Sequence, residues 1–300
     1  MAPVAATVVG LAAALDLTLG EWPERVHPVA LFGRVIHPVD RPWRAPRVVG
    51  VLVATALPLG AALVLGGAVA LAFAVHPVLG ATLGALVVFS TISLRMLVSV
   101  ARDVVTLADT DIERARADVR ALVGRDATAL SPGELRSAAL ESVAENLADG
   151  LVAPLFAFVL GAQVGLGVAV GAAVWVKAVN TLDSMLGYPT KPVGWASARL
   201  DDAVMWGPAR VAAVAIALAA RDVSALWRAR RWASTPESPN SGWPMATLAA
   251  VLDVELRKPD AYRLNPDAGL PTASDAHHGI RIGGMAGGLV VLAAAVIGWF

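Results

Sequence analysis

Residues 48–75 have the sequence VVGVLVATALPLGAALVLGGAVALAFAV, which is 28 residues without a charged side chain. After His76-Pro77, a second uncharged stretch runs from Val78 to Leu94. About 20 apolar residues in a helix are enough to cross a bilayer, and a helix satisfies its own backbone hydrogen bonds there. The two stretches therefore predict a helical hairpin in a membrane.

Four other apolar stretches decide how many times the chain crosses. Leu151–Val176 and Ile282–Phe300 are long enough to span, whereas Pro3–Leu15 and Val211–Ala220 are as easily buried or interfacial helices. The chain is 57% hydrophobic and 16% charged, against about 25% charged in ordinary soluble domains. We predict an all-α polytopic integral membrane protein of the cell membrane, with four to six apolar helices, helical cytoplasmic loops and a single domain over residues 1–300.

The polar stretches between the apolar ones are long enough to carry a function. They are Glu21–Arg47, Arg95–Gly150, Lys177–Arg210 and Arg221–Arg281. If all six apolar stretches crossed, the first, second and fourth would share one side with 20 of the 24 Lys and Arg residues, which marks that side as cytoplasmic. The third polar stretch, Lys177–Arg210, would then face outward. A re-entrant Leu151–Val176, turning at the glycine-rich Gly161–Gly167, would instead return it to the cytoplasmic side.

The composition excludes several kinds of chemistry. Equal numbers of basic and acidic residues, 24 of each, exclude a nucleic-acid binder that relies on a general basic field. The chain has no cysteine, so it has no disulfide, thiolate nucleophile or iron–sulfur cluster, and its five histidines lack zinc-ligand spacing. Known glycine-rich phosphate loops and the nucleophile elbow are also missing from the sequence. Carboxylates, amides, hydroxyls, Arg, Lys and a hard metal ion remain.

Three carboxylates are predicted on one face of a helix that enters an apolar stretch. Ser131-Pro-Gly-Glu134 has the pattern of a capping box and predicts where this helix begins. Glu141, Glu145 and Asp149 follow at i, i+4 and i+8, with Asn146 beside them. Like charges at this spacing are unfavourable unless a cation lies among them or one is protonated. We favour a Mg²⁺ site over the alternative, a solvated acidic helix end.

A stripe of polar residues follows the apolar stretch Leu151–Val176. Lys177, Asn180, Thr181 and Ser184 form a polar stripe at helical spacing, with Asp183 adjacent. A single lysine at this place is usually a snorkelling anchor, but an anchor does not explain the amide, hydroxyl and carboxylate groups on the next two turns.

Residues 194–202, GWASARLDD, predict a short helix that carries Ser197, Arg199, Asp201 and Asp202. Arg199 and Asp202 are spaced as an ordinary ion pair, and the aspartates are alternatively a second carboxylate pair of a metal-phosphate site. Residues 238–244, SPNSGWP, predict a turn-rich loop before a helix that begins near Met245. Such a loop is usually only a turn, but its hydroxyls and amide could bind an anion.

Four ordered blocks give the sequence a family resemblance. Glu141–Phe156, Lys177–Tyr188, Gly194–Asp202 and Ser238–Met245 resemble the signature blocks of the membrane-bound cobalamin biosynthesis proteins, the adenosylcobinamide-phosphate synthases. The opening, Asp16–Glu21 with His27-Pro-Val and Gly33-Arg34, is also similar. One departure is Pro236-Glu237, where family members often have His-Pro before the last block.

The resemblance implies an enzyme that joins adenosylcobyric acid to (R)-1-amino-2-propanol O-phosphate as an amide, with ATP as co-substrate and Mg²⁺. Its partners would be the corrinoid, the aminoalkyl phosphate and the lipid bilayer, and no nucleic acid. A homo-oligomer or a complex with other corrinoid enzymes stays open, as does the exact amine. The implied catalytic residues are Lys177, Asp183 and Glu145; the implied metal ligands are Glu141, Glu145 and Asp149; the implied substrate-binding residues are Asn146, Asn180, Arg199, Asp201, Asp202, Ser238 and Asn240.

The alternatives come from other classes of protein. A non-catalytic membrane sensor or transducer with the same fold is the first, but all four polar blocks are kept. A transporter would carry charged residues inside its apolar stretches, and the four long ones have none. A lipid-headgroup phosphotransferase would continue Asp-Gly-x-x-Ala-Arg, whereas Asp149-Gly150 continues Leu-Val-Ala-Pro.

Overall fold

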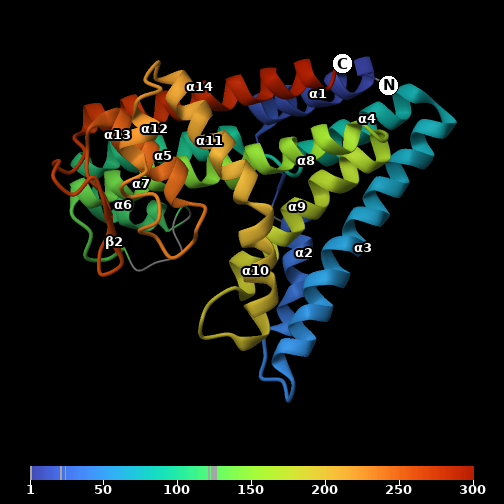
Figure 1. The fold of residues 1–300 in the computed structure, drawn as a ribbon, viewed down its shortest axis with the longest axis horizontal. Coiled ribbons are helices and arrows are strands. Elements are labelled where there is room, and N and C mark those ends of the chain that lie inside the picture. The colour runs from blue at the N-terminus through green and yellow to red at the C-terminus, as the bar shows by residue number, and fades with distance from the viewer. Residues whose placement is uncertain (1, 21, 24, 121, 123–126) are drawn as a thin grey trace. The chain divides into compact units, whose positions relative to one another are not determined.

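The computed structural model describes residues 2–20, 22, 23, 25–120, 122 and 127–300, so that Glu21 of the opening block lies outside the described part. Their regular structure is helical apart from one two-stranded antiparallel hairpin, and loops connect the elements, as Figure 1 shows. Five helices are long and apolar enough to cross a membrane. The predicted all-α polytopic membrane protein is therefore confirmed.

The described residues divide into two compact units, and each is made of separate stretches of the chain. Unit 1 comprises Met1–Ser93, Asp149–Met205 and Val291–Phe300, and unit 2 comprises Leu94–Ala148 and Trp206–Val290. Because the stretches alternate along the sequence, the chain has no single point at which it could be divided between the units. The predicted single domain over residues 1–300 stays a prediction.

Unit 1 contains the helices α1 (Ala2–Leu19), α2 (Pro28–Ile36), α3 (Pro46–Val75), α4 (Pro77–Phe89), α8 (Ala153–Ala162), α9 (Leu166–Leu186) and α10 (Trp195–Val204), with the short 3-10 turns η1 (His37–Val39) and η3 (Pro192–Gly194). Unit 2 contains α5 (Leu94–Thr110), α6 (Ile112–Val119), α7 (Pro132–Leu147), α11 (Trp206–Ala219), α12 (Ala225–Ala229), α13 (Gly242–Leu252), β1 (Leu256–Lys258) and β2 (Tyr262–Leu264). The π-helical segment η2 (Ala148–Val152) and the last helix, α14 (Ala273–Ile297), each continue from unit 2 into unit 1.

The membrane-spanning candidates differ in detail from the predicted apolar stretches. They are Pro46–Val75, Pro77–Thr110, Pro132–Ala162, Leu166–Leu186 and Ala273–Ile297, and Pro192–Val204 with Trp206–Ala219 would add a sixth if the pair forms one span. The last one begins before the predicted Ile282, because its first two turns carry polar residues that the apolar criterion missed. The N-terminal helix stays below spanning length.

Leu151–Val176 is two helices and not one span. The chain leaves α8 at Ala162, turns through residues 163–165, and returns as α9, which packs against α8. The predicted turn at the glycine-rich centre is therefore confirmed. Both polar ends of this hairpin lie at its open end, where the side chains of Asp149 and Asn180 form a hydrogen bond of 3.0 Å.

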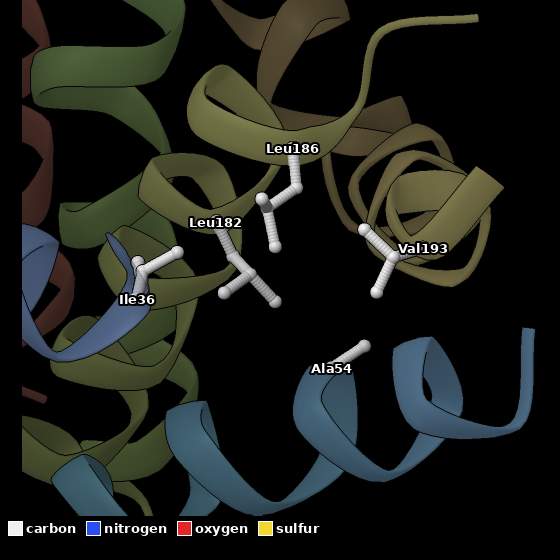
Figure 2. Close-up of a cluster of buried hydrophobic side chains, with 5 residues drawn as sticks. All are labelled: Ile36, Ala54, Leu182, Leu186 and Val193. Atoms are coloured by element: carbon white, nitrogen blue, oxygen red, sulfur yellow. The ribbon is translucent and has the colours of Figure 1, made fainter. Parts of the chain in front are cut away.

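The core of unit 1 lies where α2, α3 and α9 meet. Figure 2 shows Leu182 and Leu186 of α9 pointing toward Ala54 of α3, with Ile36 and Val193 on either side. All five are at most 5% exposed. Burying a leucine or isoleucine side chain stabilises a fold by about 1.5–3 kcal/mol where the alternative is water. This cluster fixes the end of α9 that carries the polar stripe.

Close helix packing in unit 1 depends on Gly66. A Cβ at Gly66 of α3 would lie 2.5 Å from the carbonyl oxygen of Gly167 in α9, whereas a Cβ at the neighbouring Gly67 would have nothing within 4 Å. Figure 1 shows α3 and α9 side by side along this contact. Small residues allow such backbone approach in membrane helices.

We expect Gly66→Ala to lower the thermal unfolding temperature of the purified protein, because α3 and α9 must separate to admit the methyl group. The cost should be about 1–3 kcal/mol, as for other overpacked sites. Gly67→Ala is the matched control, and should be neutral or slightly stabilising because alanine favours a helix over glycine. Equal unfolding temperatures for the two variants would contradict this packing.

The two ends of the chain meet in unit 1. A Cβ at Gly298, just after α14, would lie 3.5 Å from the Cβ of Ala5 in α1. Figure 1 shows the N- and C-termini close together. The final residues of the chain therefore pack on the first helix.

Unit 2 is built on α7, which packs against α5, α13 and β1. The hairpin of β1 and β2 pairs Leu256 with Leu264. It lies within the Pro- and Asp-rich segment Asp253–Ala276. Asp253, Asp260 and Asn265 adopt positive φ angles of 51°, 59° and 52° around it. Asp and Asn tolerate this conformation better than other side chains, which explains why they occur at these turns.

Candidate functional site

The helix with the three predicted metal ligands changes its geometry before the last of them. The capping box at Ser131 and Glu134 is present, so the predicted start of α7 is confirmed. The α-helix ends at Leu147, however, and continues as the π-helix η2. Asp149 therefore lies in the π-helical segment, whereas Glu141 and Glu145 lie on α7. The predicted common face for these three residues stays a prediction.

Asp149 instead joins the polar stripe of α9 in unit 1. The side-chain amide of Asn180 donates a hydrogen bond of 3.0 Å to Asp149 Oδ2, and it also hydrogen-bonds the carboxylate of Asp201. Asn180 is only 9% exposed. A buried carboxylate loses its hydrogen bonds with water and needs a partner in the protein. The amide of Asn180 is such a partner for both carboxylates, and it therefore holds them in fixed positions.

The start of α10 brings two further aspartates to α9. A Cβ at Gly194 would lie 1.7 Å from the carbonyl oxygen of Leu186, so only glycine permits this approach. Ser197 then donates 2.8 Å to the Gly194 carbonyl and is 2% exposed. The next turn of α10 carries Asp201 and Asp202. Ser197, a predicted site residue in the sequence block, is thus part of the support for the site.

We call Asp149, Asp183, Asp201 and Asp202 the acidic cluster. Asp201 interacts electrostatically with the other three members, and Asp183 interacts with Asp149 and Asp202. Lys177 is a cation that acts on Asp149. The Oδ1 atom of Asp201 is buried and has no hydrogen-bond partner among the described residues. Four like charges in a partly buried place attract a cation or a proton, because repulsion is weakly screened there.

The remaining members of the predicted set in unit 1 lie at the edge of this cluster. Arg199 forms the predicted pair with Asp202, at 3.6 Å, and its side chain is 71% exposed. Thr181 and Ser184 donate to carbonyl oxygens of their own helix, at 2.7 Å and 2.9 Å. Their hydroxyls therefore stabilise α9 locally, and Lys177, Asn180 and Asp183 are the stripe residues that reach the cluster.

A small cavity adjoins Lys177. It has a volume of about 240 Å³ and lies between α2, α3 and α9, with Lys177 and Thr181 in its lining and Phe32, Ala61 and Leu65 among its apolar walls. A larger cavity of about 690 Å³ lies between α3 and α9, and its lining in the described part of the chain contains no charged residue. Of these two cavities, the smaller combines apolar walls with a charged group that can bind an anion.

Glu141 has a different environment, within unit 2. Its two carboxylate oxygens accept hydrogen bonds from the hydroxyls of Ser137, at 2.7 Å, and Tyr262, at 2.8 Å. Glu141 is 4% exposed. Ser137 also accepts from the backbone amide of Arg257 at 2.7 Å, and Arg257 forms an ion pair of 2.9 Å with Glu134. Glu141 therefore ties the β-hairpin to α7.

We expect Tyr262→Phe to destabilise the protein by about 1.5–3 kcal/mol, because a buried carboxylate oxygen loses its hydrogen-bond donor. Thermal unfolding of the purified protein measures this loss. Tyr188→Phe is the matched control, since Tyr188 is half exposed and its ring contact with Lys191 survives the change. A Tyr262→Phe variant as stable as this control would show that the hairpin is not held through Glu141.

The last sequence block is also in unit 2. Asn240 is 3% exposed, and its side-chain oxygen accepts 2.6 Å from the guanidinium of Arg210. The same guanidinium lies 4.9 Å from the ring centre of Trp206 and 5.3 Å from that of Trp243. Ser238 Oγ accepts from the backbone amide of Asn240 at 3.3 Å. The predicted substrate-binding Ser238 and Asn240 thus shape a turn that holds Arg210.

Two predicted residues lie near the end of α7. The amide of Asn146 donates to the carbonyl and the hydroxyl oxygen of Ser142, at 3.1 Å and 2.9 Å. Glu145 is half-buried. The roles of Glu145 and Asn146 in catalysis and binding stay predictions.

The fit of a divalent cation can be judged from the oxygen ligands. The described residues contain no group of three or more His, Asp or Glu arranged to hold a metal ion by themselves. Mg²⁺ seldom uses an all-protein cage, and is usually bound by one or two carboxylates together with water and substrate phosphates. Asp201, with its partnerless buried oxygen, suits that kind of binding. The donors therefore fit Mg²⁺ held jointly with a phosphate ligand.

Sequence reasoning missed Tyr262 and Arg210. Tyr262 lies 121 residues from Glu141, its hydrogen-bond partner, in a segment without helical periodicity. Arg210 stands at the end of the polar stretch Lys177–Arg210, and no role was predicted for it. The sequence signal for Arg210 was its place among tryptophans, since arginine stacks on aromatic rings.

The fold and the site together define a multi-pass membrane protein whose polar groups gather at the open end of a helical hairpin. The family described as CobD/Cbib protein matches residues 9–286 of the chain. A relative from Methanothrix thermoacetophila, named "Probable cobalamin biosynthesis protein CobD", is 33% identical over 97% of this chain and 96% of its own. No solved structure matches.

Two bacterial relatives agree with this match. "Cobalamin biosynthesis protein CobD" of Rhodobacter capsulatus is 36% identical over 98% of both chains. "Cobalamin biosynthesis protein CbiB" of Salmonella typhi is 34% identical over 89% of this chain and 86% of its own. The chain belongs to the CobD/CbiB family of cobalamin biosynthesis proteins, and its role is biosynthetic, in the corrinoid pathway.

Proposed function

We propose that the protein is an adenosylcobinamide-phosphate synthase, which forms an amide between adenosylcobyric acid and (R)-1-amino-2-propanol O-phosphate at the expense of ATP. The observation that carries this proposal is the acidic cluster with Lys177 and Asn180. An amide-forming enzyme needs a cation and donors for phosphates, and a base for the amine. All three kinds of group occur in this one place.

The proposed reaction has two chemical steps. A carboxylate is a poor electrophile, so ATP transfers a phosphoryl group to it, which gives an acyl phosphate and ADP. The amine nitrogen then attacks the acyl carbon, phosphate leaves, and the nitrogen loses its extra proton to a base. The net products are the amide, ADP, phosphate and a proton.

Each residue of the cluster has a proposed part in this reaction. Mg²⁺, when bound at Asp201 with the phosphates of ATP, would neutralise their charge. Lys177 binds a phosphate oxygen, and its cavity is suited to the aminoalkyl phosphate. Asp183 accepts the proton of the amine. Asn180 keeps Asp149 and Asp201 apart at fixed positions.

The reaction itself is the test of the proposal. Protein purified in detergent would be given adenosylcobyric acid, ATP, Mg²⁺ and one of three amines: aminopropanol phosphate, ethanolamine phosphate or threonine phosphate. We expect an amide product and equimolar ADP with the first. A folded protein that makes no amide with any of the three would contradict the proposal, and would favour the non-catalytic sensor.

We place the site on the cytoplasmic face, because the α8–α9 hairpin returns both polar ends to one side. The chain has no cysteine, so a single Ser184→Cys variant can be labelled selectively, and Ser184 is exposed. In sealed right-side-out vesicles, a membrane-impermeant maleimide should not react until the vesicles are opened. Full labelling in the intact vesicles would contradict a cytoplasmic site.

A further inference from the structure

Residues 221–232, which we call the basic segment, play no part in the proposed reaction. The sequence is RDVSALWRARRW, and it begins directly after the apolar helix α11, which ends at Ala219. The short helix α12 lies within it and turns Ala225 and Ala229, both fully buried, toward the interior of unit 2. Val223, Trp227 and Arg230 of the segment are exposed.

The basic segment has an excess of positive charge that no ion pair among the described residues neutralises. Asp222 forms an ion pair of 2.7 Å with Arg228, and hydrogen bonds from Arg228 and Ser224 hold the pKa of Asp222 below its usual value. Arg228 is thereby paired. Arg221, Arg230 and Arg231 are exposed and form no ion pair with the described residues.

The neighbouring helix offers no counter-charge. α13 packs against α12, and its sequence, GWPMATLAAVL, contains no charged residue. The remaining acidic side chain before Ser238 is the exposed Glu237, which follows Pro236. Three arginines are thus available for an external anion.

An exposed aromatic ring accompanies the arginines. Trp227 is 71% exposed, and the guanidinium of Arg230 lies 5.0 Å from its ring centre. Val223 is 55% exposed on the same segment. Tryptophan prefers the interface between lipid headgroups and acyl chains, and arginine clusters next to a membrane helix attract anionic lipids.

We propose that the basic segment is a binding surface for anionic phospholipid headgroups of the surrounding bilayer. Trp227 inserts at the level of the headgroups, and Arg221, Arg230 and Arg231 bind their phosphates. Each arginine near a membrane surface favours anionic lipid by about fivefold. The surface would recruit such lipids whether or not the chain catalyses amide formation.

The test measures how strongly brominated lipids quench the fluorescence of Trp227. The full chain is reconstituted in phosphatidylcholine nanodiscs that contain the same fraction of either dibrominated phosphatidylglycerol or dibrominated phosphatidylcholine. Bromine quenches nearby indoles, and the emission of Trp227 is the difference between wild type and Trp227→Phe. We expect several-fold stronger quenching by the brominated phosphatidylglycerol. Equal quenching by the two lipids would overturn the proposal.

Three sets of variants distinguish the charge of this surface from the total charge of the protein. Replacing Arg221, Arg230 and Arg231 by Gln should abolish the preference, and replacing them by Lys should keep most of it. Replacing the exposed Arg102, Arg114 and Arg120 by Gln removes the same charge elsewhere and should change nothing. An equal loss in this control, or a preference that soluble glycerol phosphate abolishes, would overturn the proposal.

Discussion

Asp201→Asn should abolish amide formation and make the protein more stable. The substitution keeps the shape of the side chain and an oxygen to accept from Asn180, but removes one charge from the acidic cluster. Loss of a group that binds the reacting phosphates should lower turnover by about 10²-fold or more. The buried Oδ1 atom of Asp201 has no hydrogen-bond partner among the described residues. Removing its negative charge should therefore raise the free energy of unfolding by about 1 kcal/mol.

The opposite signs of the two effects make this prediction specific. Turnover would be measured as amide produced from adenosylcobyric acid, and stability as thermal unfolding, both on protein in the same nanodiscs. Asp118→Asn is the control, because Asp118 forms a surface pair of 4.0 Å with Arg114, the one ion pair it makes with a described residue, and the change should alter neither quantity. An Asp201→Asn variant that is inactive and also less stable would indicate a structural role for Asp201.

Lys177→Met should be the second most damaging change. Methionine keeps the length of the side chain but removes the cation that acts on Asp149. Loss of a phosphate contact should reduce turnover by about 10²-fold. We also expect a loss of about 1–2 kcal/mol in stability, because the carboxylate of Asp149 then lacks an opposing charge.

A double variant identifies the partner of Lys177. In Lys177→Met with Asp149→Asn, the unpaired carboxylate is gone, so stability should recover by an interaction energy of about 0.5–2 kcal/mol. Activity should not recover, since the phosphate contact remains absent. Lys177→Arg keeps the charge and should keep the stability. Additive losses in the double variant would show that Lys177 and Asp149 are not coupled.

Much of the fold could be predicted from the sequence because lipid imposes length and composition on a spanning helix. The stretch around Val48–Val75 became α3 almost residue for residue, and the capping box at Ser131 marked the start of α7. Helical periodicity in the same way placed Lys177 and Asn180 on one face of α9. These are local patterns, and local patterns are visible in a sequence.

The parts that could not be predicted depend on distant contacts. The π-helix at Ala148–Val152 has no composition signal, and the hydrogen bond between Asp149 and Asn180 joins residues 31 positions apart. The approach of α10 to α9 depends on Gly194 having no side chain, which spacing alone does not reveal. Glu141 was predicted as a metal ligand from its helical spacing, and its hydrogen bond with Tyr262, 121 residues away, is not visible in a local pattern.

The meeting of the two chain ends bears on how the protein is made. Unit 1 includes both α1 and residues 291–300, and Gly298 lies against Ala5. The first helix packs on α4 and α8, but it lacks this last partner until residues 291–300 have been synthesised. Unit 1 is therefore completed by residues that are made about 280 positions after α1.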